Sequence, residues 1–549
     1  MPAPAKAANS IANDTCDRRN FVLPLLLAAG FAVRALSPLL YPNFAHPDEV
    51  YQNVEQAYWQ LTGHGLLTWE YYYGIRSALF PMFLAWVIKL CWVLGLSTPS
   101  AYLALRLSMD AISLPIIACA FVWGRRTGLP GADLLSGLLV CLWPDLVYFS
   151  SHPLTEVAAA AFLIPGICLA ESTPGHALKK SGVFAAALLL SAASVLRFQY
   201  GPAALAVWGI LAWRDRRTGL PAAVLGGLIP VLAGGLSDWI SLGRPFQSIW
   251  LNFIVNWNYG ASSAYGTSSW YAFFGKFALM WDGAFAFILA LAAIGALRSR
   301  LVALAAVVLL ATHMIVPHKE YRFLYAMVPL VLTLAGIGTA RAIEIVSEWS
   351  ARQPAPQRFA GKNTSIGIAG CVWLISAACL YLNQETLFLF RKNTGAVATQ
   401  FDLARRPNVC GIAEWNISKY MLAGEFGFGH RVTVFYPATK AEFLSRQRGF
   451  NAVVYQPGKS GMPSARNWTK LGCRPVNGPL PALLTIVPET GEVCLATRPG
   501  PCSTVPPLAT PLDIPPEMAG KPFPWLAHPL PLQSRMAAGN PILTPIVNH

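Results

Sequence analysis

Charged side chains are scarce in this chain. Only 12% of its 549 residues are Asp, Glu, Lys or Arg, whereas 54% are hydrophobic. Ordinary globular domains carry about 25% charged residues. Together with a mean hydropathy of +0.45, this composition argues against a soluble enzyme and indicates a protein that crosses a membrane many times. The expected fold class is mainly α, and the lipid bilayer is the first predicted partner.

The basic residues do not gather into the surface that a nucleic acid requires. The net charge is +15, but Lys and Arg are scattered in short loops between apolar runs. This pattern fits the excess of positive charge in cytoplasmic loops. We therefore expect no nucleic-acid partner.

Cysteine pairs that bind metal are also absent from the sequence. None of the eleven cysteines shows a CxxC or His–Cys spacing typical of zinc. We expect no cofactor and no metal, although Asp48, Glu49 and Glu70 could bind one. An oxidising compartment would permit disulfides in the polar C-terminal part, with the pairing left open among Cys410, Cys473, Cys494 and Cys502.

The sequence has no fixed short repeat and no evident cleavable signal peptide. Residues 1–20 are polar and are predicted as a cytoplasmic segment. Apolar runs of about 20 residues, the length that spans a bilayer, predict about 11–13 transmembrane helices within 21–383. These runs begin near residues 21, 78, 101, 133, 154, 182, 202, 221, 278, 301, 324 and 366.

Basic clusters give the expected orientation. From residue 125 onward they fall on alternate loops, which we place in the cytoplasm. One conflict remains between 78 and 124, where two spans would return Arg125 to the outside. Either one of these runs is not a simple span, or one more crossing is present. This orientation places everything after residue 384 on the outer side of the membrane, together with four loops: 41–77, 150–153, 241–276 and 318–322.

The polar C-terminal part differs in character from the rest. Strand-like runs at 431–435 and 452–455 flank a helical stretch at 438–447. This order predicts a small soluble α/β domain over 384–500 on the outer side. Residues 501–549 are rich in Pro and poor in charge, as expected for an extended tail.

The outer loop 41–77 carries the first candidate site. Apolar residues at helical spacing follow its start, so Asp48 and Glu49 occupy the first turn of a short interfacial helix. Two acids there often only complement the helix dipole. Their neighbour His46 and the nearby Glu70 favour a catalytic role instead, because transfer of a sugar to a hydroxyl needs a base.

A second cluster, HKEYR at 318–322, lies between two apolar runs. Three potentially cationic groups within five residues are costly near lipid and usually face a cavity or the interface. His318, Lys319 and Arg322 suit a departing phosphate, whose charge they would neutralise. A topology signal is the alternative, but the expected outer placement of this loop argues against it.

Other polar residues leave more than one interpretation open. The 241–276 loop is rich in Asn, Ser, Gly, Trp and Tyr, which suits sugar contact or an interfacial aromatic belt. Arg76, Arg106 and Arg197 lie near span ends, where arginines serve a site or reach to headgroups. An acid inside an apolar run needs a partner, most simply an arginine; these acids are Asp110 and Asp145. His152 and Glu156 could face the same cavity as the loop.

With these residues in view, the chain resembles the Alg9-like family of dolichol-phosphate-mannose-dependent α-mannosyltransferases, which includes the GPI mannosyltransferases. The resemblance covers about residues 20–345. It rests on His46-Pro47-Asp48-Glu49, Thr68-Trp69-Glu70, Ile75-Arg76-Ser77 with Pro81, Asn256, Tyr265-Gly266, Trp270-Tyr271, and His318-Lys319-Glu320-Tyr321-Arg322-Phe323 with Pro329.

The resemblance implies a GT-C membrane fold and a polyprenyl-phosphate sugar donor. It also implies inversion, from a β-linked donor to an α-linked product. By the motif match, Asp48 is the catalytic carboxylate and Glu49 stands beside it. The donor phosphate would meet His318, Lys319, Arg322 and Arg76. The residues expected to bind substrate are His46, Trp69, Glu70, Asn256, Tyr265 and Trp270.

One family motif departs from the pattern, because residues 151–156 (SHPLTE) replace a stretch rich in Arg and Asn. The composition, rich in Ala, Pro and Trp, looks bacterial. A bacterial inner membrane disfavours a GPI acceptor and favours undecaprenyl or a similar carrier over dolichol. We therefore expect a hexosyltransferase, with mannose as the expected sugar, that acts on an outer-side glycan or glycolipid. The alternatives are a transporter or flippase of lipid-linked sugars and a transferase of an aminosugar to lipid A.

Overall fold

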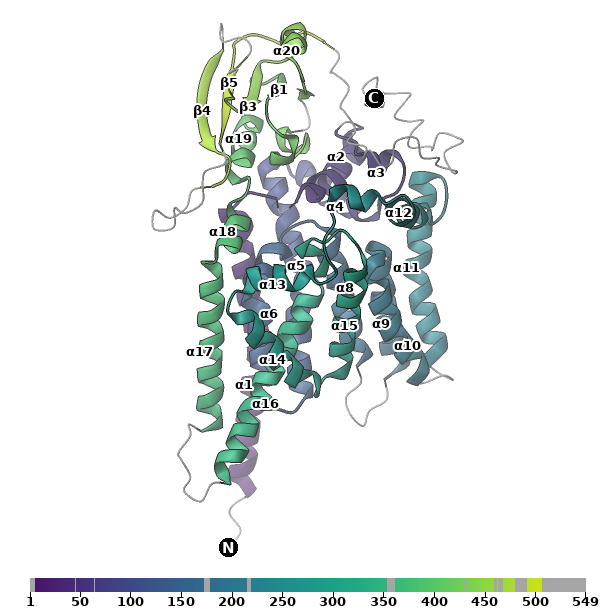
Figure 1. Cartoon of the computed structure of the whole chain (residues 1–549), viewed down its shortest axis with the longest axis vertical. Helices are drawn as coiled ribbons and strands as arrows, with labels where there is room; N and C mark the ends of the chain where they lie inside the picture. The colour runs from purple at the N-terminus through teal and green to yellow at the C-terminus, as the bar shows by residue number, and fades with distance from the viewer. Residues whose placement is uncertain are drawn as a thin grey trace.

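The computed structural model shows a long helical body that carries a small sheet region at one end (Figure 1). Most of the predicted tail 501–549 and residues 1–4 lie outside the described residues. Side chains are described from residue 21 onward. The structure describes residues 5–44, 46–63, 65–171, 178–214, 219–352, 361–429, 432–458, 462, 468–478 and 491–505.

Several helices of the body have the length and composition of membrane spans. Among the described residues, five qualify by themselves: α1 (Ala5–Leu40, through its part Phe21–Leu40), α5 (Thr98–Arg126), α11 (Gly219–Leu242), α16 (Met327–Ala351) and α17 (Lys362–Tyr381). Two bent pairs also qualify, α6 (Ala132–Leu142) with α7 (Pro144–Ser150), and α13 (Ala272–Trp281) with α14 (Ala284–Ala296). The predicted mainly helical, multi-span fold is confirmed. The count of 11–13 spans stays a prediction.

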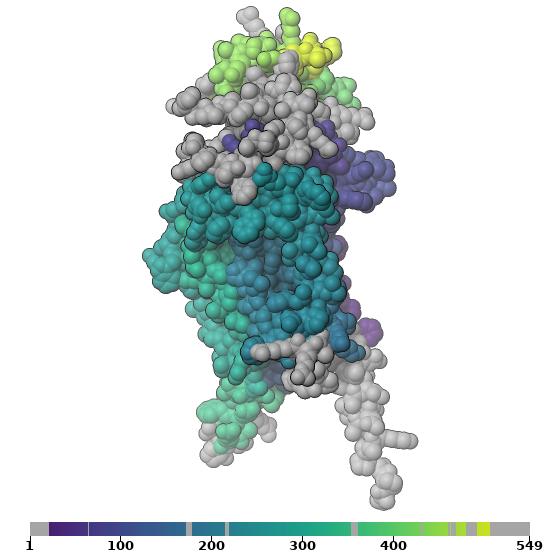
Figure 2. Space-filling model, turned by 90° about the vertical axis from the view of Figure 1, so that its right-hand side faces the viewer, coloured from purple at the N-terminus to yellow at the C-terminus, as the bar shows by residue number. Residues whose placement is uncertain are grey.

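Shorter helices complete the body. Those that are apolar and below spanning length are α4 (Leu79–Val93), α8 (Thr155–Ala170), α9 (Lys180–Leu196) and α15 (Arg300–Ile315). Helix α10 (Gly201–Arg214) lies beside α9 and α15. Figure 2 views the side of the body on which α11 lies. Trp239 and Ile240 of α11 are strongly exposed. Exposed apolar side chains on spanning helices suit contact with lipid.

Proline and glycine shape the packing of the body. Trp143 is extended, as residues before proline tend to be, so α6 ends there and α7 leaves at 57°. A Cβ at Gly295 would lie 2.0 Å from the Leu334 carbonyl, and one at Gly338 1.9 Å from that of Leu291. These two glycines let α14 and α16 approach as closely as small residues allow in membrane proteins.

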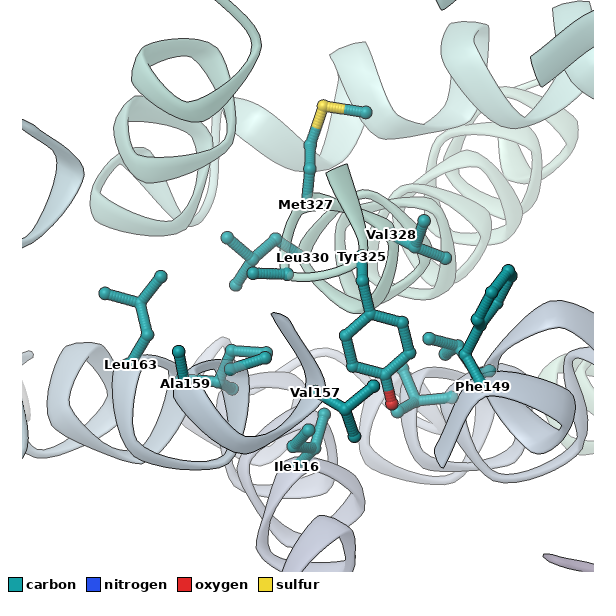
Figure 3. Packing of buried hydrophobic residues seen from close by; sticks show 14 of the residues in the cluster. Ile116, Phe149, Val157, Ala159, Leu163, Tyr325, Met327, Val328 and Leu330 are labelled. Atoms are coloured by element: carbon teal, nitrogen blue, oxygen red, sulfur yellow. The ribbon is translucent and has the colours of Figure 1, made fainter. Parts of the chain in front are cut away.

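The buried core packs the start of α16 against α8, although the two are far apart in the sequence. Figure 3 shows Tyr325 and Leu330, around the start of α16, facing Val157 and other residues of α8, whereas Met327 points away from α8. These side chains belong to one large buried cluster, in which Leu330 and Val157 have no exposed surface. This packing fixes the segment just before α16 against the start of α8.

Helix α4 resolves the conflict in the predicted topology. Its 15 residues are about 22 Å long, less than the roughly 30 Å of a hydrocarbon core. Both of its ends contact α2 (Glu55–Thr62): Gln60 reaches the Ala78 carbonyl, and the rings of Tyr58 and Trp92 meet edge-to-face. The run at 78–96 therefore lies along α2 and is shorter than a simple span, which favours the first of the two alternatives.

The C-terminal region contains a five-stranded sheet in the order β2-β1-β3-β5-β4. Strands β2 (Thr433–Phe435), β1 (Gly411–Trp415) and β3 (Ala452–Tyr455) are parallel, whereas β5 (Glu492–Thr497) and β4 (Thr469–Pro475) pair antiparallel. Helices α18 (Gln384–Arg391), α19 (Thr394–Ala404) and α20 (Lys440–Arg446) accompany it. The predicted α/β character is confirmed, and sequence reasoning missed β1, β4 and β5. The disulfides are Cys410–Cys502 and Cys473–Cys494.

A buried carboxylate fastens this region to the 41–77 loop. The oxygens of Glu55 accept hydrogen bonds from the backbone N–H groups of Phe426 (2.7 Å) and Leu66 (2.9 Å). Burial raises the pKa of Glu55 to about 7 and those of Glu414 and Glu425 to about 8. Backbone hydrogen bonds lower the pKa of Glu55 in part. Glu55 further raises the pKa values of Glu414 and Glu425, while Lys419 lowers the pKa of Glu414 and Tyr436 that of Glu425.

We expect this interface to weaken as the pH rises. Below the ordinary glutamate pKa of about 4.3, folded and unfolded chains both keep these protons. Between that value and 7 to 8 the unfolded chain releases them first, so the free energy of unfolding falls as pH rises. Hydrogen exchange at the Phe426 and Leu66 amides, corrected for intrinsic rates, should show more opening at pH 8.5 than at pH 6. A Glu425→Gln variant should flatten this difference, and equal opening at both pH values would contradict the expectation.

Candidate active site

A cavity of about 640 Å³ lies between the helical body and the loops at its sheet-bearing end. Its walls come from segments far apart in the sequence, including three of the four loops predicted to share one side, 41–77, 241–276 and 318–322. The lining residues fall within 46–53, 66–76, 155–156, 197–202, 252–265, 312–323 and 419–420.

Asp48 reaches the cavity from the first turn of the loop helix. Pro47 stands at the position where helices commonly begin with proline, and the π-helix η1 (Glu49–Val54) continues from Asp48 into α2. Val50 and Val54 are completely buried and hold η1 to the body. The Asp48 side chain is 28% exposed, so a substrate can reach it.

Arg322 enters the cavity from the turn between α15 and α16. Val316 is extended, as expected before Pro317, so α15 ends there. The short helix η5 (Tyr321–Leu324) then presents the guanidinium. Its Nη2 donates to Asp48 Oδ2 over 2.6 Å, although 274 residues separate the two. Its Nη1 and Nε donate to Glu156 (2.7 Å) and Glu320 (2.6 Å).

The charges of this cluster stabilise one another. Burial alone would raise the pKa of Asp48, but Arg322, His46 and Arg76 hold it well below its ordinary value. Burial likewise opposes a charged Glu320, yet Arg322 and His318 depress its pKa. The pKa of Arg322 is raised well above normal by the surrounding carboxylates, against the effect of burial. Asp48 is therefore an ionised carboxylate whose basicity its partners suppress.

Two histidines connect the cluster to its surroundings. The Nδ1 of His46 lies 3.5 Å from Asp48 Oδ1, and its Nε2 lies 3.3 Å from Glu320 Oε2. His318 Nε2 lies 2.8 Å from Glu320 Oε1, and its Nδ1 lies 3.0 Å from the Gly266 carbonyl. Because both ring nitrogens of His318 face acceptors, the protonated form is favoured and its pKa is raised.

Glu49 points away from the cavity into the protein core. Its Oε2 lies 2.8 Å from His152 Nδ1, and its Oε1 accepts from the Tyr102 hydroxyl over 3.2 Å. His152 in turn lies 3.1 Å from Arg106 Nη2. These contacts indicate a structural role for Glu49, which fastens η1 to α5.

We expect Glu49→Ala to destabilise the fold by roughly 3 kcal/mol, because a buried network loses its charged acceptor. Turnover per folded molecule should persist, since Asp48 keeps its partners. Chemical unfolding of the purified protein measures the first effect and normalised activity the second. Glu348→Ala, at a half-exposed acid near the far end of α16, is the matched control. Full stability combined with lost turnover would return Glu49 to the chemistry.

Most of the other predicted site residues line the cavity. Trp69 donates from its indole nitrogen to the Tyr265 hydroxyl over 3.2 Å, and Glu70 accepts from Gln52 over 2.9 Å. Asn256 donates to the Asn252 carbonyl and side-chain oxygen. The predicted residues on the walls are His46, Asp48, Trp69, Glu70, Arg76, Asn256, Tyr265, His318 and Arg322.

Besides Glu49, two predicted residues lie elsewhere. Lys319 is buried, and its ammonium donates to the backbone carbonyls of Val316 (2.6 Å) and Ser268 (3.3 Å) rather than facing the cavity. Trp270 is 63% exposed and packs edge-to-face on Tyr271, away from the lining residues. Lys319 therefore holds the 266–268 turn in place, and Trp270 fits an exposed interfacial ring.

The structure also brings in residues that sequence reasoning underrated. Glu156 and Arg197 line the cavity and lie 3.3 Å apart. Glu156 was expected only as a residue that could face this cavity, and Arg197 as a single arginine at a span end; the sequence did not predict that they meet. Asp145 was expected to pair with an arginine; instead it accepts hydrogen bonds from Trp281 and Tyr321.

The described residues offer little for a metal ion. Asp48, Glu49 and Glu70 cannot serve jointly, because Glu49 faces the core. In the described part of the chain, one group of three potential ligands lies close together, Cys473, Glu492 and Cys494. Its two cysteines form a disulfide, so this group does not fit a metal.

Comparison with known proteins identifies the family. The pattern of the Alg9-like mannosyltransferase family matches residues 25–416, which is well over half of the chain. The chain belongs to this family. Its match contains both the Asp48 loop and the Arg322 motif, so most of the cavity wall lies within the part that the Alg9-like family shares.

Curated members of the Alg9-like family match over about 330 residues. Mannosyltransferase APTG1 of Arabidopsis thaliana is 28% identical over 56% of this chain and 57% of its own length. GPI mannosyltransferase 3 of Yarrowia lipolytica is 26% identical, over 58% and 62%. Human GPI alpha-1,2-mannosyltransferase 3 is 23% identical, over 57% and 56%. The chain thus spans less than two thirds of each relative.

A solved structure shows the same fold. ArnT from Cupriavidus metallidurans, bound to undecaprenyl phosphate, superposes with a TM-score of 0.55 over 86% of this chain and 97% of its own, at 14% identity. At that identity the likeness shows the fold alone. The predicted GT-C architecture of this Alg9-like protein is confirmed.

Proposed function

We propose that this protein transfers mannose from a polyprenyl-phosphate donor to a hydroxyl of a glycan or glycolipid, with inversion at the anomeric carbon. The observation that carries the proposal is the meeting of Asp48 and Arg322 in one cavity. It supplies a base and a phosphate-binding cation side by side. Membership of a mannosyltransferase family favours this function over a transporter and over transfer of an aminosugar.

The reaction balances with the groups present. The acceptor oxygen attacks C1 of the mannose while its proton passes to Asp48. The bond between C1 and the phosphate oxygen breaks, and its electron pair leaves with the phosphate. Arg322, His318 and Arg76 offset the charge that develops there. No proton donor is required for the leaving group, because a phosphate departs as an anion.

The Asp48–Arg322 contact also links the base to the donor. The Arg322 guanidinium suppresses the basicity of Asp48 by holding its pKa well below the ordinary value. A donor phosphate that takes one arm of the guanidinium would weaken this contact, because Arg binds phosphate through the same paired N–H groups. Asp48 would then become a stronger base when the donor is in place.

Several finer expectations remain part of this proposal. We assign residues 21–383 as the catalytic domain and place the cavity on the outer side of a bacterial inner membrane, with undecaprenyl or a similar carrier. The outer placement is supported by the disulfide pairs of the 384–500 region, because disulfides persist in oxidising compartments. The printed title of the ArnT structure names undecaprenyl phosphate as its ligand, which supports a carrier of this class.

Proteoliposomes that contain labelled polyprenyl-phosphate mannose test the function. A transferase consumes the donor and releases polyprenyl phosphate together with labelled glycan. A transporter moves the donor across the membrane unchanged. Recovery of intact labelled lipid only, in the presence of membrane extract as a source of acceptors, would overturn the proposal.

A further inference from the structure

One segment of the C-terminal region forms part of the cavity wall. Lys419 and Tyr420, in the stretch after β1, are its described residues that line the cavity. Lys419 is half-buried, and Tyr420 is 41% exposed. Both lie just beyond residue 416, where the family match ends. What they recognise is therefore a property of this chain rather than of the shared family pattern.

This segment rests directly on the helix that carries the base. The hydroxyl of Tyr51, in η1, donates to the Lys419 carbonyl over 2.5 Å. The rings of Tyr51 and Tyr420 meet edge-to-face with centres 5.7 Å apart. Tyr51 is buried and lies three residues after Asp48. Lys419 and Tyr420 therefore border the part of the cavity beside Asp48.

The two side chains together suit an anionic sugar. The Lys419 ammonium lies 5.4 Å from the centre of the Tyr420 ring. An exposed aromatic ring offers a flat apolar face to a sugar, and a lysine ammonium acts as a point charge toward phosphate. The donor phosphate already has cations on other segments of the wall, Arg322, His318 and Arg76.

We propose that Lys419 and Tyr420 form the acceptor subsite, and that the acceptor is a glycan carrying a phosphate next to its reacting sugar. This inference rests on the proposed function, because a transferase needs an acceptor beside its base. The acceptor hydroxyl must lie within hydrogen-bond reach of Asp48. The contacts of Tyr51 hold the pair at that place.

Equilibrium binding to the full chain in lipid nanodiscs tests the subsite. The probes are labelled mannose 6-phosphate and methyl α-mannoside, with polyprenyl phosphate at saturation so that the donor site is filled. The wild type should bind mannose 6-phosphate about tenfold more tightly, the size of one charge-assisted contact. Lys419→Gln should remove this preference without weakening methyl α-mannoside, and Tyr420→Ala should weaken both probes.

Two further variants separate recognition from folding. Lys419→Arg keeps the charge and should retain the preference, whereas Lys440→Gln changes an exposed lysine of α20 outside the cavity and should have no effect. Equal binding of both probes to the wild type, or a preference that survives Lys419→Gln, overturns the subsite. Loss of the preference for mannose 6-phosphate in both Lys419→Gln and Lys419→Arg also overturns the subsite. Donor turnover is measured separately: its absence from the wild type overturns the proposed function, whatever the probes show.

Discussion

Replacing Asp48 with Asn is expected to lower mannosyl transfer by about 10²- to 10⁴-fold, the range for loss of a general base. Asn has nearly the same size and keeps the cavity filled in the same way. Arg322 retains Glu156 and Glu320 as partners, so the protein should still fold. The measurement is the initial rate of label transfer per folded molecule, together with the unfolding midpoint.

Asp402→Asn provides the matched control for this variant. Asp402 is a partly exposed acid of α19 that pairs with Arg405 and Arg474, and exposed pairs of this kind contribute about 0–1 kcal/mol. Its loss should leave transfer unchanged. Wild-type rates in Asp48→Asn would sink the assignment of the base.

Arg322→Ala is expected to lower kcat/KM for the donor by about 10²- to 10³-fold, because the departing phosphate loses a preorganised cation. The free energy of unfolding should also fall, since three carboxylates lose a shared partner. The pH profile supplies a distinct signature. Without Arg322 the pKa of Asp48 rises, so the base becomes protonated at higher pH as the solution is acidified. The acid limb of the residual activity should therefore move upward in pH.

Arg341→Ala controls for the loss of a paired arginine far from the cavity. Arg341 lies on α16 and contacts Glu344 and Glu348. This variant should leave the dependence of rate on donor concentration unchanged. If Arg322→Ala also left that dependence and the acid limb in place, Arg322 would have no part in the donor site.

Much of the architecture follows from patterns that act over many residues. The apolar runs predict the helical body, and the alternation of basic loops groups the segments that meet in the cavity. The sequence left open whether 78–96 is a span, because length and composition do not distinguish a spanning helix from α4, which lies along α2. The sheet was only partly visible, since β1 contains the buried Glu414 and so breaks the expected pattern.

The motifs predicted which segments form the site, but not the direction in which each of their side chains points. Successive residues of a helix point about 100° apart, so Asp48 and Glu49 face different surroundings although the sequence presents them as a pair. The partners of Glu49 come from α5 and from the turn after α7, which no local pattern reveals. Lys319 and Arg322 differ for the same reason, because one side chain meets backbone carbonyls and the other meets the cavity.

His46 stands between two carboxylates, within 3.5 Å of Asp48 and 3.3 Å of Glu320. In the proposed reaction the phosphate gains one negative charge as its bond to C1 breaks, and Asp48 loses one by accepting a proton. The total charge of the site is then the same before and after transfer, so no ion has to enter a cavity of low dielectric. The proton itself must leave before the next cycle, and an imidazole that reaches both acids provides the route. Resetting the enzyme is then a movement of one proton through His46.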